Sequence, residues 1–267
     1  MALSNPAFSK TPEFAQKRGA STAAPLTDEE LNAMYGRPSA GPTDTDRMSY
    51  DDTIVKTAAM FAVLLVGGVV GAFNPILALP AALVGFVLAM VNIFKKKPSV
   101  PLIMAYSVVQ GVFIGGISFL LEGRFEGIIL QATMGTLIVF AVTLALFASG
   151  KVRASKRATK IFMIAGISYA AFSLVNLGLQ VFGVSQDPWG LYTGANIFGI
   201  PLGLIIGPLA ILMGAYSLVL DFTSVKQGVE SGAPRIMGWK AAFGLVMTII
   251  WLYIEFLRLI AIIRGSN

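Results

Sequence analysis

Long apolar segments separated by short polar ones dominate most of the chain. No charged residue occurs between Lys56 and Phe94, a stretch too long for one membrane crossing, which needs about 20 residues. The turn dipeptide Asn74-Pro75 divides this stretch, so the pattern predicts one helix near 55–73 and another near 75–94. Five further apolar segments predict helices near 102–121, 127–149, 161–183, 195–222 and 239–263.

These segments predict an all-α membrane protein, a bundle of seven transmembrane helices over residues 54–264. Composition points the same way, because 55% of the 267 residues are hydrophobic and only 13% are charged. A soluble domain carries about 25% charged residues, and it could not hide so much apolar surface. The expected surroundings are therefore a lipid bilayer.

The two ends of the chain differ from this pattern. Residues 1–53 are rich in Pro, Ser, Thr, Ala and charge, which predicts a disordered polar tail. Residues 27–30 (TDEE) could cap a short helix within this tail. The tail contains no apolar core of a signal peptide. Residues 265–267 form a short C-terminal tail.

Basic residues indicate how the predicted helices cross the membrane. They collect in the loops that follow the second, fourth and sixth helices, whereas the opposite side holds only Arg124 and Arg264. The positive-inside rule then places the N-terminus in the cytoplasm and the C-terminus outside. The net charge of +6 reflects these loops, and no mixture of basic and aromatic residues indicates nucleic-acid binding. The loop residues are Lys95, Lys96, Lys97, Lys151, Arg153, Lys156, Arg157, Lys160, Lys226, Arg235 and Lys240.

The chain has no cysteine and no histidine. This composition excludes disulfides, thiolate or histidine metal sites, cysteine nucleophiles and Ser-His-Asp catalysis. Any proton-linked behaviour must therefore depend on carboxylates. We expect no enzymatic activity and no resident cofactor.

Two acidic residues, Asp221 and Glu255, lie within predicted spans. Ionisable groups there cost around 3 kcal/mol or more and are seldom kept without a partner or a water-filled path. Arg258 follows Glu255 by three residues, on nearly the same helix face. In one interpretation Arg258 neutralises Glu255, and Asp221 only caps the water-exposed end of its helix.

In the other interpretation the last two helices bring Asp221 and Glu255 together. Two carboxylates in a dry interior cannot both ionise cheaply, so they would share one proton. The protonated pair would be a hydrogen-bonded latch, and the ionised pair would attract a cation. Calcium favours such oxygen ligands, so the pair could form a pH-sensing gate with a calcium site.

The segments around these acids resemble the Bax inhibitor family, also called the transmembrane Bax-inhibitor-motif family. The resemblance is carried by residues 216–222 (YSLVLDF) and 252–256 (LYIEF), and by the basic loop after the second helix. It implies a bundle in which the seventh helix is central. It also implies an acidic pair, matching Asp221 and Glu255, that senses pH and controls calcium leak.

The pattern is most similar to actinobacterial members, with a long polar tail before residues 50–53 (YDDT), which implies a bacterial cell membrane. The sequence departs from the family pattern in three ways. Glu255 stands where Asp is usual, and Arg258 offers it a competing partner. The loop between the last two helices also looks longer than usual.

Several functions stay open at this point. The first is a pH-sensitive calcium leak channel that conducts calcium ions or protons. The second is a non-conducting regulator of membrane proteases or stress responses, acting through membrane-protein partners. Pro201 and Pro208 could mark a secondary transporter, since broken helices line transport sites. An intramembrane protease is least favoured, because no protease motif surrounds either acid.

Overall fold

The computed structural model describes residues 46–184 and 189–265, all of which belong to one compact unit. The described residues contain seven helices that are long and apolar enough to cross a membrane, which confirms the predicted all-α seven-helix class. They are α2 (Tyr50–Phe73), η1 with α3 (Pro75–Leu77, Ala78–Phe94), α4 (Val100–Glu122), α5 (Ile128–Ala148), α6 (Lys156–Val181), α8 (Leu202–Glu230) and α9 (Met237–Gly265). The predictions for residues 1–45 and 266–267 lie outside the described residues.

Capping residues set where two helices begin. The hydroxyl of Ser49 accepts a hydrogen bond from the backbone N–H of Asp52 at 3.2 Å, so α2 starts at Tyr50 rather than near residue 55. Residues 50–53, predicted to end the polar tail, are therefore helical. Ser155 caps α6 in the same way through the N–H of Ala158, which adds basic residues of the predicted loop to that helix.

The sixth spanning helix, α8, is displaced from its predicted range. It begins at Leu202, after a small hairpin of β1 (Asn196–Ile197) and β2 (Ile200–Pro201) and the short α7 (Leu191–Gly194). It continues to Glu230, so the prediction of a loop between the sixth and seventh helices is wrong over about the first half of that loop. Helical structure continues there because polar residues are tolerated in a helix that leaves the hydrocarbon, where Lys226 pairs with Glu230.

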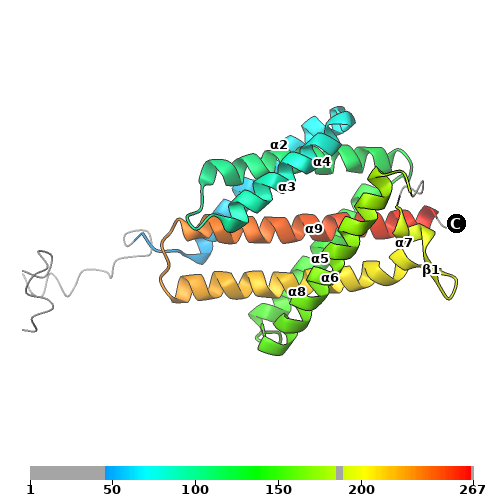
Figure 1. The fold of residues 1–267 in the computed structure, drawn as a ribbon. Helices are drawn as coiled ribbons and strands as arrows, with labels where there is room; N and C mark the ends of the chain where they lie inside the picture. Colours follow the sequence, from blue (N-terminus) through cyan, green and yellow to red (C-terminus); the bar gives the residue numbers. More distant parts are fainter. Residues whose placement is uncertain (1–45, 185–188, 266–267) are drawn as a thin grey trace, which may run out of the picture. The chain divides into compact units, whose positions relative to one another are not determined.

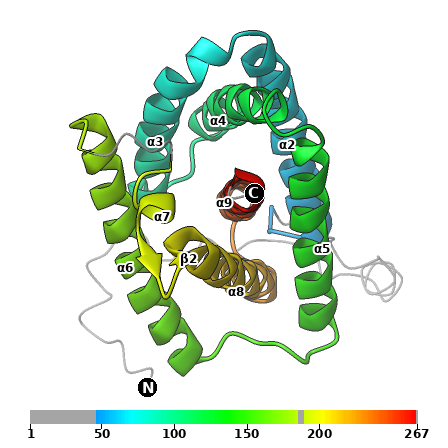
Figure 2. The same cartoon turned by 90° about the vertical axis from the view of Figure 1, so that its right-hand side faces the viewer.

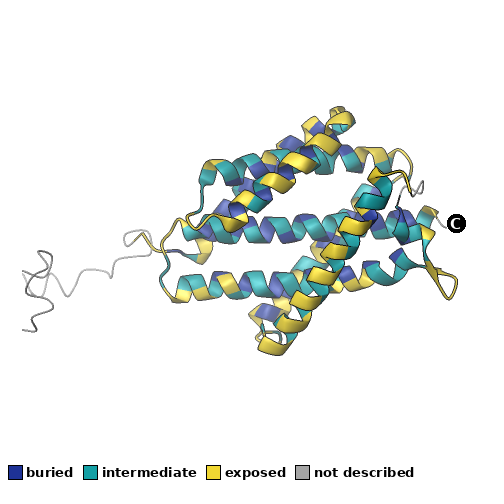
Figure 3. Ribbon diagram, in the orientation of Figure 1, coloured by how far each residue is buried: buried dark blue, intermediate teal, exposed yellow. Residues whose placement is uncertain are grey.

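Helix α9 lies in the middle of the bundle. Figures 1 and 2 show it running between α8 and the α2–α4 pair, and Figure 2 shows the other long helices around it. Half of its most apolar window is buried, against 6% for the peripheral α6. Figure 3 shows the same contrast, with exposed residues concentrated on the outward faces of the surrounding helices. Side chains on α9 are therefore enclosed by protein on most sides.

The closest helix packing is between α2 and α4. Gly71 on α2 faces the backbone of Val112, and Gly115 on α4 faces the backbone of Gly68. A side chain at either glycine would overlap these backbone atoms, so both positions require glycine. Small residues at such contacts let membrane helices approach closely. This pair forms a rigid wall against which α9 packs through Met60, Tyr106 and Phe243.

Candidate functional site

Glu255 lies near the centre of the protein on α9, and only 1% of the residue is exposed. Its carboxylate accepts hydrogen bonds from the hydroxyl of Tyr169 on α6 and from Nε1 of Trp251, the latter at 3.0 Å. Arg258, one turn further along α9, donates to the same carboxylate and forms an ion pair with it. The Glu255 carboxylate is therefore neutralised and fully hydrogen-bonded inside the bundle.

Arg258 is also held by aromatic rings. Its guanidinium carbon lies 4.1 Å from the ring centroid of Tyr192 and 5.9 Å from that of Tyr169. Such cation–π contacts stabilise a cation that has lost its water. The Nε atom of Arg258 is buried and is without a hydrogen-bond partner within the described part of the chain. The Glu255 carboxylate and the two tyrosine rings together replace hydration for this cation.

Asp221 occupies a second polar cluster, on α8. Its Oδ2 atom accepts a hydrogen bond of 2.6 Å from the hydroxyl of Thr248 on α9. The hydroxyls of Thr248 and Ser217 are 3.2 Å apart, so Ser217 extends the cluster along α8. The contacts of Asp221 are thus made with neutral hydroxyl groups, unlike those of Glu255.

The structure does not bring Asp221 and Glu255 together as a hydrogen-bonded pair, which corrects that expectation. Asp221 contacts Thr248, and seven residues of α9, or about 10 Å of helix, separate Thr248 from Glu255. The cause is the register of the α8–α9 hairpin. Asp221 lies nine residues before the end of α8, whereas Glu255 lies eighteen residues after the start of α9.

An apolar layer separates the two clusters. Leu218 and Leu252 are both fully buried, and Leu252 packs directly against Gly214 of α8. A carbon atom added at Gly214 would lie 2.8 Å from the Leu252 Cγ atom, so the two helices touch here. Apolar side chains therefore lie at the α8–α9 contact between the positions of Asp221 and Glu255.

The same geometry corrects the expectation of one calcium site shared by both acids. The Asp221 carboxylate is bonded to Thr248, and the Glu255 carboxylate to Tyr169, Trp251 and Arg258, so the two do not face one ion in this conformation. Within residues 46–184 and 189–265, no group of three or more acidic, cysteine or histidine residues is placed to bind a metal. Arg258, predicted as a competing partner, is the observed partner of Glu255.

Several residues of the site were not predicted. Thr248 and Trp251 are two of them, although they recur with the predicted Glu255 and Arg258 at intervals of three or four residues along one side of α9. This spacing was available in the sequence. Tyr169 and Tyr192 had no such signal, because they reach α9 from helices distant in the chain.

One comparison with known proteins identifies a family for this chain. A comparison with curated proteins gives no match. The family model described as "Bax inhibitor 1 like" matches residues 5–265, which is nearly the whole chain. The chain therefore belongs to the Bax inhibitor 1 like family of membrane proteins.

Proposed function

We propose that this protein is a pH-sensitive cation leak channel with calcium as the transported ion, and that the present conformation is closed. One observation carries the proposal: two carboxylates from the last two helices lie along the buried central helix α9, and one of them is neutralised by a tethered cation. Ionisable residues within membrane spans are costly, and they commonly mark ion or proton pathways. The proposal includes no catalytic step and no resident cofactor.

In this proposal Arg258 takes the place of the transported ion beside Glu255. A guanidinium bound to the carboxylate supplies the positive charge that calcium would otherwise supply, so the ion pair closes the path. Opening requires Arg258 to leave Glu255 and the apolar layer at Leu252 to part. Hydrophobic constrictions of this kind can gate channels by excluding water. Hydroxyl and carboxylate oxygens of Ser217, Thr248 and Asp221 would then offer successive oxygen ligands.

The two acids have different roles in pH sensing. Asp221 contacts hydroxyl groups, from Thr248 directly and from Ser217 through it, whereas Glu255 is paired with Arg258. Protonation of Asp221 would remove the negative charge from its half of the path. Flux should therefore fall as the pH falls, and Asp221 should set most of that dependence. By the positive-inside rule, Asp221 faces the cytoplasmic side of a bacterial cell membrane.

Calcium uptake into proteoliposomes that contain an internal calcium indicator tests this function. Arg258→Gln should raise flux several-fold, because it removes the resident cation from Glu255. Asp221→Asn should lower flux and flatten its pH dependence. Glu230→Gln, which changes an exposed acid on the same helix as Asp221, is the matched control and should behave as the wild type. Uptake by wild type and Arg258→Gln no faster than in protein-free vesicles would rule out conduction.

A second candidate function is a non-conducting regulator of membrane proteases or stress responses. The closed ion pair of Glu255 and Arg258 and the intact apolar layer favour it, since both oppose conduction. The N-terminal tail would make the regulatory contacts. Deleting residues 1–45 leaves the described contacts in place, so it should abolish regulation in cells while any flux survives. Loss of flux together with loss of regulation would count against this second function.

A further inference from the structure

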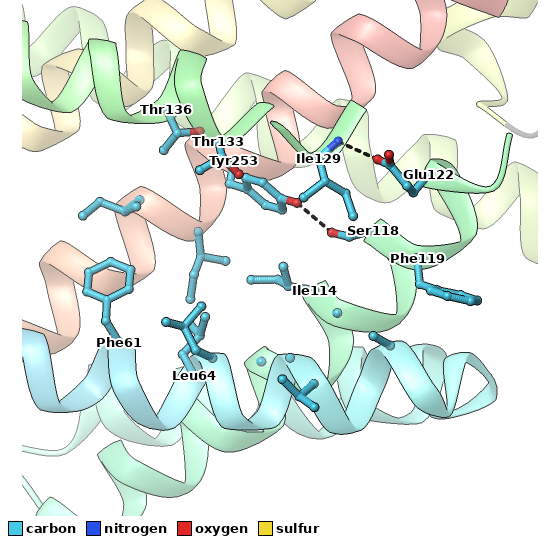
Figure 4. A pocket seen from close by; sticks show the side chains of 18 of the residues that line it. Phe61, Leu64, Ile114, Ser118, Phe119, Glu122, Ile129, Thr133, Thr136 and Tyr253 are labelled. Carbon is cyan, nitrogen blue, oxygen red and sulfur yellow. Dashed lines mark hydrogen bonds between the residues drawn. The ribbon is translucent and has the colours of Figure 1, made fainter. Parts of the chain in front are cut away.

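A cavity of about 570 Å³ lies away from the charged cluster, on the other side of α9. Figure 4 shows it between α2 and α5, with α4 and α9 forming its floor. Its walls are almost entirely apolar, and they include Phe61, Leu64, Val69, Ile114 and Ile250. The proposed ion path does not use this cavity.

This cavity is an open groove, and its length is about half the thickness of the hydrocarbon core of a membrane. Along α2 it reaches from Phe61 to Ala72, eleven residues or about 16 Å of helix. The hydrocarbon core of a bilayer is about 30 Å thick, so this length corresponds to one leaflet. Ala72 lies next to the end of α2, so the groove starts near the membrane surface and ends near the midplane.

Polar groups are concentrated near the surface end of the groove. Glu122 is the last residue of α4, and its carboxylate accepts hydrogen bonds from the backbone N–H groups of Gly127 at 2.6 Å and Ile129 at 3.0 Å. The hydroxyls of Ser118 and Tyr253 bond each other at 2.8 Å, as Figure 4 shows. Deeper along α5 the lining also includes Thr133 and Thr136, and the Thr136 hydroxyl donates to the carbonyl of Ala132 within the helix. The one carboxylate of the lining therefore lies at the surface end, as the polar part of a lipid does.

The groove also opens sideways to the bilayer. Leu65 and Val69 on α2 and Leu137 on α5 line it, and each is more than half exposed. We propose that the groove binds one acyl chain of a membrane lipid from the leaflet at the Glu122 side. A hydrocarbon chain is apolar along its length, as are most of the residues that line the groove. A single hydrocarbon chain is narrow enough to enter.

Native mass spectrometry of protein extracted from phosphatidylglycerol vesicles in mild detergent tests this proposal. The wild type should retain one phospholipid per chain. Thr133→Trp, which places a ring in the groove, should lose it. Leu130→Trp is the matched control, because Leu130 lies on the same helix and is 68% exposed without lining the groove. Equal retention by both variants, or no retained lipid in the wild type, would overturn the proposal.

A second measurement keeps the test valid if Thr133→Trp folds poorly. Wild-type protein in vesicles with a diazirine-bearing acyl chain is irradiated, and the labelled residues are mapped by mass spectrometry. Labels should concentrate on groove residues such as Ile114 and Thr133, above the level at Leu130. Uniform labelling of all lipid-facing residues contradicts the proposal. Crosslinked dimers joined through this face would instead assign the groove to a second copy of the chain.

Discussion

Arg258 donates to the Glu255 carboxylate across one turn of α9, and both residues are at least nine-tenths buried. The sequence places the two charges three residues apart, so the pair forms within one helix. Because both charges belong to α9, separation of the helices alone does not part them, and the Arg258 side chain itself must move away from Glu255. The neutralising cation is therefore part of α9 itself, while Tyr169 and Tyr192 supply contacts from α6 and α7 that helix movement can break.

Removing one partner of this pair should destabilise the protein more than removing both. Glu255→Leu leaves the Arg258 cation buried without its carboxylate, a change that costs about 3–5 kcal/mol. The double variant Glu255→Leu, Arg258→Met removes both charges and should recover most of that loss. Thermal unfolding in detergent measures the difference. Equal destabilisation by the single and double variants would contradict the expectation that the Arg258 cation becomes unfavourable once its carboxylate is removed.

The apolar layer gives a second prediction, on flux. Leu252→Ala leaves a cavity between the two polar clusters and should cost about 2–5 kcal/mol of stability. It should also raise calcium flux, because water can enter the enlarged gap. Leu257→Ala is the matched control, since Leu257 is equally buried on α9 but packs toward α5. If both variants leave flux at the wild-type level, Leu252 is not the barrier.

The sequence predicted the spanning helices well. About 20 consecutive apolar residues, in a chain with so few charged residues, are typical of a helix that crosses a membrane. The ion pair of Glu255 and Arg258 also followed from their spacing. The contact between Asp221 and Thr248 could not be predicted from spacing. It depends on where the α8–α9 turn falls, and polar residues up to Glu230 belong to the helix although they resemble a loop.

The aromatic residues around Arg258 were equally hidden from sequence reasoning. Tyr169 and Tyr192 come from segments separated from α9 by many residues, so their contact depends on how whole helices pack. A tyrosine in an apolar segment is usually explained by packing or by an interface position. Only the assembled bundle shows that these hydroxyls and rings surround a charge.

The contact between α2 and α4 gives a third prediction. Gly71→Ala would place a methyl group into the backbone of Val112, and overpacking of this kind costs about 1–3 kcal/mol. Gly178→Ala is the control, because nothing lies within 4 Å of a carbon added there on α6. That control should be neutral or stabilise the helix by about 0.5–1 kcal/mol. Equal melting temperatures for the two variants would mean that α2 and α4 are not packed this tightly.

The fourth prediction concerns a clasp at the basic end of the bundle, formed by residues 46–56 and the loop 231–236. Its backbone part joins Met48 N–H to the carbonyl of Ala233 at 2.8 Å and Arg235 N–H to the carbonyl of Asp46 at 2.9 Å. Its charged part is centred on Asp52, which binds Lys56 and, at 2.9 Å, the Nε atom of Arg235.

Asp52→Asn should loosen this clasp, because it removes the negative charge that pairs with both Lys56 and Arg235. The positive charge of Lys56 then stays buried without its carboxylate. Hydrogen bonds to charged groups contribute about 1.5–3 kcal/mol, so the loss should be near that range. Glu230→Gln breaks only the exposed pair with Lys226 and should change stability by less than about 1 kcal/mol.

Amide hydrogen exchange separates local opening of the clasp from global loss of stability. In Asp52→Asn the amides of Met48 and Arg235 should exchange faster, because these two N–H groups bond across the clasp. Amides in the middle of α9 should keep their protection, since α9 is held by the surrounding helices. Uniformly faster exchange along the chain would indicate that Asp52 stabilises the whole bundle rather than this junction.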